Sequence, residues 1–128
     1  MGKASQRKGR RGEFELVRVL RENGFYGVTA AEPLNFGTIP DLYGLPGVHI
    51  ECKRMERLSM TAALQQADRD AQRFQDGLPA VFHRANRQPW LVTMRLSDWA
   101  RMYGAAIGQP PKNPTRGAGD GIDAANSK

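Results

Sequence analysis

The chain has 128 residues, of which 40% are hydrophobic, and it carries a formal net charge of +6 with a sequence pI of about 10.0. This length suits one domain with a modest core. No apolar run approaches the length that crossing a bilayer requires, and residues 1–5 lack the apolar stretch of a secretory signal. One cysteine, Cys52, excludes an internal disulfide framework and a Cys-rich zinc site, so we expect a reducing, cytoplasmic setting and no membrane partner.

The positive charge is concentrated near the N-terminus. Seven basic residues lie between positions 3 and 21, against two acidic ones. Clusters of this kind favour polyanions, because neutralising phosphates releases counterions. Nucleic acid is the first partner to consider, with an anionic membrane surface or a merely solubilising arm as alternatives. We expect residues 1–9 to form a flexible basic arm.

The apolar spacing from about residue 10 to residue 23 predicts an amphipathic helix that stops at Asn23-Gly24. On a helical wheel Glu13 falls near the middle of the apolar face, whereas Glu15 falls on the opposite, polar face. A carboxylate aimed at a core needs an ionic partner or a metal. Alternatively, Glu13 only complements the helix dipole from the first turn.

The segment from about residue 39 to residue 53 predicts a β-hairpin, after a strand over residues 25–30. Leu45-Pro46-Gly47-Val48 fits a type II turn, with glycine where φ must be positive. Folding about this turn would set Asp41 opposite or diagonal to Glu51, while Glu51 and Lys53 share one face of their strand. Two acids can gather a divalent cation, and a lysine beside it can position water or stabilise negative charge. The alternative is a solvated ion pair on an exposed strand.

Downstream, Ser59 can cap a second helix that runs to about Gln75, with an apolar stripe facing a core. We assign its other faces to solvent, including Asp70, although Gln66 or Arg73 could flank a substrate strand. Two strands follow at 79–83 and 90–94, around a basic turn, and a short helix spans 97–103. Residues 104–128 are rich in Gly and Pro and are expected to be disordered. This order predicts a compact α/β domain with a mixed sheet.

Several of these residues together resemble the PD-(D/E)xK nuclease superfamily. The resemblance is carried by Lys8-Gly9 and Gly12-Glu13-Phe14-Glu15-Leu16 on the first helix, by Pro40-Asp41, and by Ile50-Glu51-Cys52-Lys53. Within the superfamily the chain is most similar to small resolvases of the archaeal Holliday-junction type and their phage relatives. The match covers roughly residues 7–94. It implies a restriction-endonuclease-like core over residues 10–103, a mixed β-sheet flanked by helices, in a bacterial or phage-infected cell.

The resemblance also implies roles for individual residues. Asp41 and Glu51 would be metal ligands, with the backbone carbonyl of Cys52 as a further oxygen. Glu13 would complete the acidic site from the first helix, and Lys53 would orient the attacking water or stabilise charge on the phosphate. The implied cofactor is Mg²⁺, for which Mn²⁺ can substitute.

The expected partner is DNA, most of all four-way junction or other branched DNA, cut by a homodimer. Contacts to phosphates are expected from basic side chains near the acidic site, namely Lys8, Arg10, Arg11 and Arg73. Two other functions stay open: a nuclease of the same fold acting on duplex or flap DNA, and a non-catalytic basic DNA-binding module. His49 shares the Glu51 face, and we expect it to be structural or substrate-facing rather than a ligand.

Overall fold

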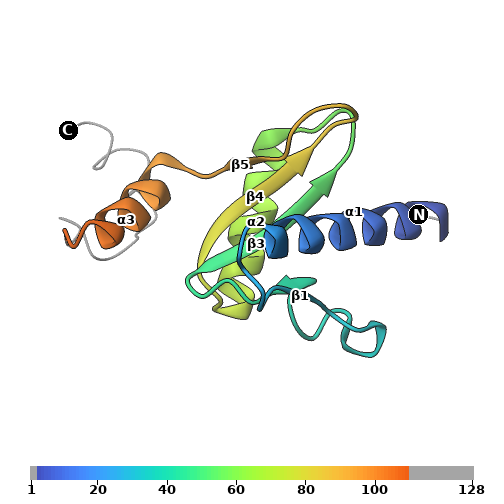
Figure 1. Cartoon of the computed structure of the whole chain (residues 1–128), viewed down its shortest axis with the longest axis horizontal. Helices are drawn as coiled ribbons and strands as arrows, with labels where there is room; N and C mark the ends of the chain where they lie inside the picture. The colour runs from blue at the N-terminus through green and yellow to red at the C-terminus, as the bar shows by residue number, and fades with distance from the viewer. Residues whose placement is uncertain (1–2, 110–128) are drawn as a thin grey trace. The chain divides into compact units, whose positions relative to one another are not determined.

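The computed structural model describes residues 3–109 of the chain, and the side chains of residues 9–109. The chain divides between Thr93 and Met94 into two compact units, of which the first contains every candidate site residue. The elements of the first unit are α1 (Lys3–Glu22), β1 (Thr29–Ala30), a 3-10 helix (Pro33–Asn35), β2 (Leu42–Tyr43), β3 (Val48–Arg54), α2 (Met60–Phe74), β4 (Leu78–Arg84) and β5 (Leu91–Thr93) (Figure 1).

The centre of this unit is a three-stranded mixed sheet in the order β3-β4-β5. β3 runs parallel to β4, with Glu51 beside Val81, and β4 runs antiparallel to β5. Neighbouring side chains on a strand point to opposite faces. Arg54 reaches Glu15 on α1 and Lys53 reaches Gln66 on α2, so the two helices cover opposite faces of the sheet (Figure 1). The predicted α/β fold, a mixed sheet flanked by helices, is confirmed.

α2 forms much as its sequence predicts. The Ser59 hydroxyl accepts a hydrogen bond from the Ala62 N–H at 3.3 Å, which caps the helix at its first turn. Ala63 and Ala67, spaced by one turn, are buried with Val81 of β4. Small residues at this spacing let the helix lie close to the sheet. Because β3 and β4 are parallel and α2 connects them, the three elements form one crossover unit.

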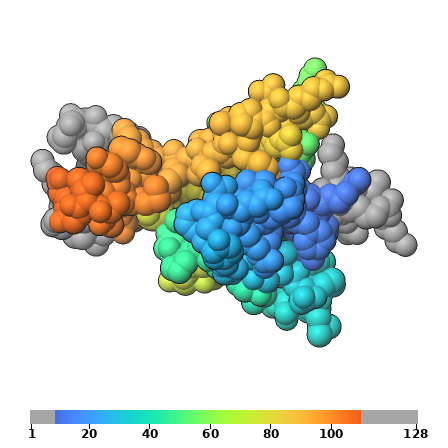
Figure 2. Space-filling model, in the orientation of Figure 1, coloured from blue at the N-terminus to red at the C-terminus, as the bar shows by residue number. Residues whose placement is uncertain are grey.

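α1 begins at Lys3, so residues 3–9, which we assigned to an arm, belong to the helix. Leu16 and Val17 are buried on its inner side. At Gly12 an added Cβ would lie 2.6 Å from the Cβ of Arg54, closer than real contacts. Glycine at this position therefore permits the close packing of α1 on β3, and α1 forms the front surface of this unit in Figure 2.

The predicted hairpin between Asp41 and Glu51 is wrong, although its turn is confirmed. The Val48 N–H donates to the Leu45 carbonyl at 3.0 Å, and Gly47 has φ +88°. However, the strand that follows Asp41 is β2, which pairs with β1, whereas Glu51 lies on β3, which pairs with β4. A largely buried strand gains more by pairing with β4 inside the sheet than with a two-residue neighbour. The strand expected over residues 25–30 is shorter in the structure, where β1 comprises only residues 29–30.

The remaining predictions for this region are close. The antiparallel pair β4–β5 confirms the strands expected around residues 79–94. In the second unit α3 (Leu96–Ala106) is longer than expected, so residues 104–106 are helical rather than disordered, and residues 110–128 lie outside the described part. Trp99 and Tyr103 stack within α3 at 5.1 Å. Among the described helices, none is long and apolar enough to span a membrane.

Candidate functional site

A small cavity of about 130 Å³ brings several of the predicted site residues together. It is bounded by β3, by the segment before β2 and by the C-terminal half of α2, through the side chains of Asp41, Glu51, Asp70, Arg73 and their neighbours. Residues from both faces of β3 contribute to its wall. Because β3 is an edge strand, the cavity lies along the free edge of the sheet.

Glu51 is the central acid of this cavity, with a side chain that is 10% exposed. Its Oε1 lies 3.3 Å from Nε2 of His49, and its Oε2 lies 3.8 Å from Nζ of Lys53. Lys53 also donates a hydrogen bond of 2.8 Å to Oε1 of Gln66 on α2. The three side chains of β3 thus form a row on one face, as strand alternation predicts.

Asp41 and Glu13 add two more carboxyl groups to this region. Asp41 lines the cavity directly, from the residue before β2. The pKa of Glu13 is raised, mainly by burial and then by the nearby negative charges of Asp41 and Glu51. Its salt bridge with Arg10, at 3.0 Å, offsets only part of this effect. Three acids from separate elements therefore lie close enough in a partly buried region for their charges to interact.

The backbone at Cys52 is oriented toward this same edge. At the two ends of β3, the Gly47 carbonyl accepts a hydrogen bond from the Leu78 N–H, and the Met55 N–H donates one to the Arg84 carbonyl. The backbone N–H and C=O groups of the odd-numbered residues in β3 therefore face β4. Directions alternate along a strand, so the Cys52 carbonyl faces the free edge and the cavity. Burial raises the pKa of the Cys52 thiol to about 12, which agrees with a packing role for this side chain rather than a nucleophilic one.

A second combination of ligand atoms occupies the same cavity. One ligand atom from each of His49, Glu51 and Asp70 lies within 4.8 Å of the other two, so these residues form a possible metal-binding triad. The two oxygens of Asp76 lie 3.0 and 2.9 Å from Nδ1 of His49. The prediction that Asp70 belongs to a solvent-facing side of its helix is wrong, because this residue lines the cavity. Asp70 lies one helical turn after Gln66, on the side of α2 that faces Lys53, but this facing is visible only in the structure.

Glu15 is not the solvent-facing residue that the helical wheel predicted. It forms an ion pair with Arg54 at 3.1 Å and another with Arg84, and it accepts a 3.2 Å hydrogen bond from the Trp90 indole. Partial burial raises its pKa, but the hydrogen bonds from Arg84 and Arg54 outweigh burial, so the net pKa is lowered. Glu15 therefore links α1 to β3 and to the β4–β5 hairpin.

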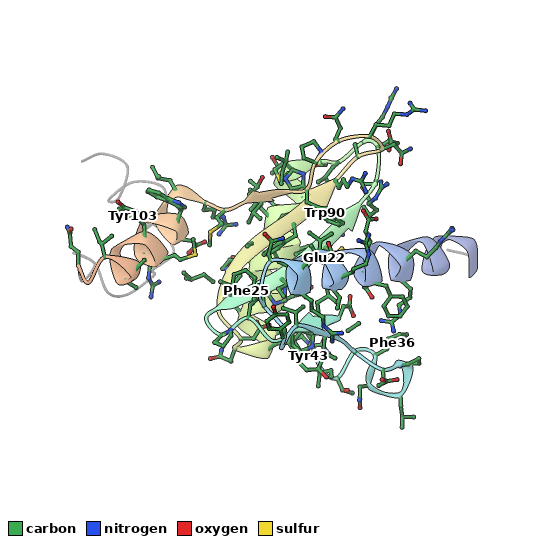
Figure 3. All side chains as sticks on the ribbon, in the orientation of Figure 1. Glu22, Phe25, Phe36, Tyr43, Trp90 and Tyr103 are labelled. Carbon is green, nitrogen blue, oxygen red and sulfur yellow. The ribbon has the colours of Figure 1, made fainter. Side chains whose placement is uncertain are left out.

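The predicted DNA-contacting side chains have different surroundings. Arg10 lies over the rings of Phe14 and Phe36, at 4.5 and 4.9 Å from their centroids, and Figure 3 shows Phe36 below α1. Arg73 donates to the Gly37 carbonyl at the rim of the cavity. Arg11 is exposed, and the side chain of Lys8 lies outside the described part. Contact of these residues with DNA stays a prediction.

A larger hollow of about 580 Å³ lies along α1, lined by Phe14, Val17, Arg18, Arg21, Glu22 and Tyr26. It holds one acid and no lysine or histidine, so the chemistry is concentrated in the smaller cavity. Comparison with protein-family models, with curated proteins and with solved structures finds no match for the chain.

Proposed function

We propose that the chain is a Mg²⁺-dependent DNA endonuclease with a restriction-endonuclease-like core, acting on branched DNA. The observation that carries the proposal is the convergence of Asp41 and Glu51 on one cavity, with Lys53 at 3.8 Å from Glu51. These are the residues on which the resemblance to PD-(D/E)xK nucleases rests. They come together although the hairpin expected to join them does not form.

The donor set suits a hard divalent cation. Asp41 and Glu51 offer carboxylate oxygens, and the Cys52 carbonyl faces the same edge, which is the oxygen-rich coordination that Mg²⁺ prefers. Burial raises the pKa of Glu13, and the negative charges of Asp41 and Glu51 raise it further. A cation beside these acids would favour their charged forms, and Mn²⁺ can replace Mg²⁺ at such a site.

Each residue then has a distinct task. Asp41, Glu51 and the Cys52 carbonyl would hold the ion, which when bound lowers the pKa of water and stabilises charge on the transferring phosphate. Lys53, fixed by Gln66, directs its ammonium group beside Glu51, where it can orient water or stabilise the negative charge that develops on the phosphate. Glu13 supplies additional negative charge from α1.

The charge of the chain favours a polyanionic partner. Its net charge is +6, and Arg11 is exposed on α1, the helix that also carries Glu13. Branched DNA and a homodimer follow from the resemblance to junction resolvases, since two strands must be cut symmetrically. Duplex and flap DNA are the competing substrates.

The test is cleavage of four-way junction, duplex and flap DNA, each with Mg²⁺ and with EDTA. Metal-dependent cutting that is fastest on the junction supports the proposal, whereas preference for duplex or flap DNA reassigns the substrate. Lys53→Ala should lose orders of magnitude in single-turnover cleavage, while junction affinity in Ca²⁺ changes less than about tenfold. A pure wild-type protein that binds junctions but never cuts DNA, in Mg²⁺ or Mn²⁺, would identify a binding module instead.

A further inference from the structure

We propose that His49 and Asp70 belong to the cation site together with Glu51, so that the site prefers Mn²⁺ to Mg²⁺. This inference deepens the proposed function, because it concerns the ion that the same cavity would hold. His49 has a side chain that is 3% exposed, and its imidazole lies between two carboxyl groups, those of Asp76 and Glu51.

The hydrogen bonds of His49 point to a cation at Nε2. Both oxygens of Asp76 lie within 3.0 Å of Nδ1, a distance at which an N–H at this position would donate to the carboxylate. Nε2 on the other side of the ring lies 3.3 Å from Oε1 of Glu51, so a ligand nitrogen and a ligand oxygen are adjacent at the cavity.

The spacing suits a metal ion. Two ligand atoms bound to one ion at about 2.1 Å lie roughly 3.0–3.4 Å apart in octahedral or tetrahedral geometry. The distance from Nε2 of His49 to Oε1 of Glu51 is 3.3 Å and lies in this range. The ligand atom of Asp70 is within 4.8 Å of both, so a shift of its side chain can bring it to the same ion. Asp76 takes the place of the carboxylate that commonly orients a metal-ligating histidine and fixes its tautomer.

The mixed donor set determines which ion is favoured. Imidazole nitrogen binds first-row transition ions better than Mg²⁺, whereas carboxylates accept both Mg²⁺ and Mn²⁺. Mn²⁺ satisfies both donor types, so we expect the DNA-free protein to bind Mn²⁺ at least about tenfold more tightly than Mg²⁺. The proton is the competing occupant of Nε2, and it would leave His49 as an imidazolium paired with two carboxylates.

Pulsed electron paramagnetic resonance of bound Mn²⁺ separates the two occupants. Mn²⁺ is titrated into the DNA-free full-length chain, and the electron spin echo is examined for modulation by imidazole ¹⁴N. We expect this modulation in the wild type and in His83→Gln, and its loss in His49→Gln. The chain has two histidines, and His83 lies instead beside the Thr93 hydroxyl at 2.8 Å, so it is a matched control. If His49→Gln does not fold, modulation retained in His83→Gln still assigns the nitrogen to His49.

Two further variants test the supporting residues by Mn²⁺ affinity. Asp70→Asn should weaken Mn²⁺ binding, and Asp76→Asn should weaken it by about tenfold or more while the ¹⁴N modulation persists. Failure of the wild type to bind Mn²⁺, or binding without ¹⁴N modulation, would overturn the inference. Modulation in a protein that cuts no DNA would support this inference and refute the nuclease. Mg²⁺-dependent cutting by a protein whose bound Mn²⁺ shows no ¹⁴N modulation would support the nuclease and refute this inference.

Discussion

Lys53 Nζ donates a hydrogen bond of 2.8 Å to Gln66 Oε1, which joins the end of β3 to the middle of α2 beside the candidate site. If Lys53 acts on the reacting phosphate, Gln66 is a positioning residue. Gln66→Ala should then reduce the single-turnover cleavage rate about tenfold or more, with little change in junction affinity measured in Ca²⁺. Gln65→Ala is the control, since Gln65 is exposed on the same helix. Equal rates for the two variants would contradict a positioning role.

Asp41→Asn and Glu51→Gln should each abolish cleavage while leaving the fold intact. Each removes one negative ligand from the cavity that both residues line, which weakens the hold on the cation. Affinity for DNA should persist or increase, because a negative charge near phosphates is lost. Cleavage in Mg²⁺ and binding in Ca²⁺ are measured on one junction. Near-normal cutting by Glu51→Gln would exclude the cavity as the metal site, and near-normal cutting by Asp41→Asn would exclude Asp41 as a ligand.

Glu15→Gln should lower the free energy of unfolding at neutral pH by about 1.5–3 kcal/mol, the range for hydrogen bonds to a charged group. The folded-state pKa of Glu15 is lowered, so its contribution is present above the ordinary pKa of glutamate and is lost as pH falls through the folded-state value. The difference between wild type and variant should therefore shrink in acid. Glu22→Gln, which removes an exposed pair with Arg18, should change stability by less than about 1 kcal/mol. Denaturant unfolding between neutral and acidic pH measures both.

Glu13→Gln should act in the opposite sense on stability. Its pKa is raised, so the fold favours the protonated acid and loses stability as pH rises through the pKa range of this group. In EDTA at neutral pH the variant should be at least as stable as the wild type, yet cleavage in Mg²⁺ should fall strongly. A clear loss of stability in EDTA would mean that the Arg10 salt bridge, at 3.0 Å, dominates instead.

Gly12→Ala should destabilise the protein by about 1–3 kcal/mol, since its methyl group would overlap the side chain of Arg54. Gly9→Ala, on the same helix with nothing within 4 Å of the added Cβ, should instead stabilise it by up to about 1 kcal/mol. Thermal unfolding of the two variants compares the same chemical change in two environments. Equal effects would show that α1 does not pack against β3 this closely.

Local chemistry made much of the fold predictable. The capping hydroxyl of Ser59 and the turn at Gly47 depend on adjacent residues, and both are confirmed. The pairing of β3 with β4 depends on residues about thirty positions apart, beyond the reach of turn geometry, and the hairpin prediction failed there. Periodicity could place Glu13 toward the interior, but it could not show that Arg84 and Trp90 would come to Glu15.

The candidate site was predictable to a similar extent. Asp41, Glu51 and Lys53 carry a recognisable spacing, and they do converge. Asp70 and Asp76 reach the cavity because the crossover from β3 to β4 brings α2 and its C-terminal end beside β3. No local pattern distinguishes these two acids from ordinary surface aspartates.

Asp41 and Glu51 are held in place by β-strand pairings of very different length. Glu51 belongs to β3, which is paired with β4 along seven residues, whereas Asp41 is held through β2 and a 2.8 Å hydrogen bond from Ala31 to its carbonyl. β1 and β2 pair over only two residues, so this ladder can open locally while the sheet stays intact. Asp41 and Glu51 therefore follow different opening equilibria. The apparent affinity of any cation bound by both acids is reduced by the fraction of molecules in which the short ladder is open.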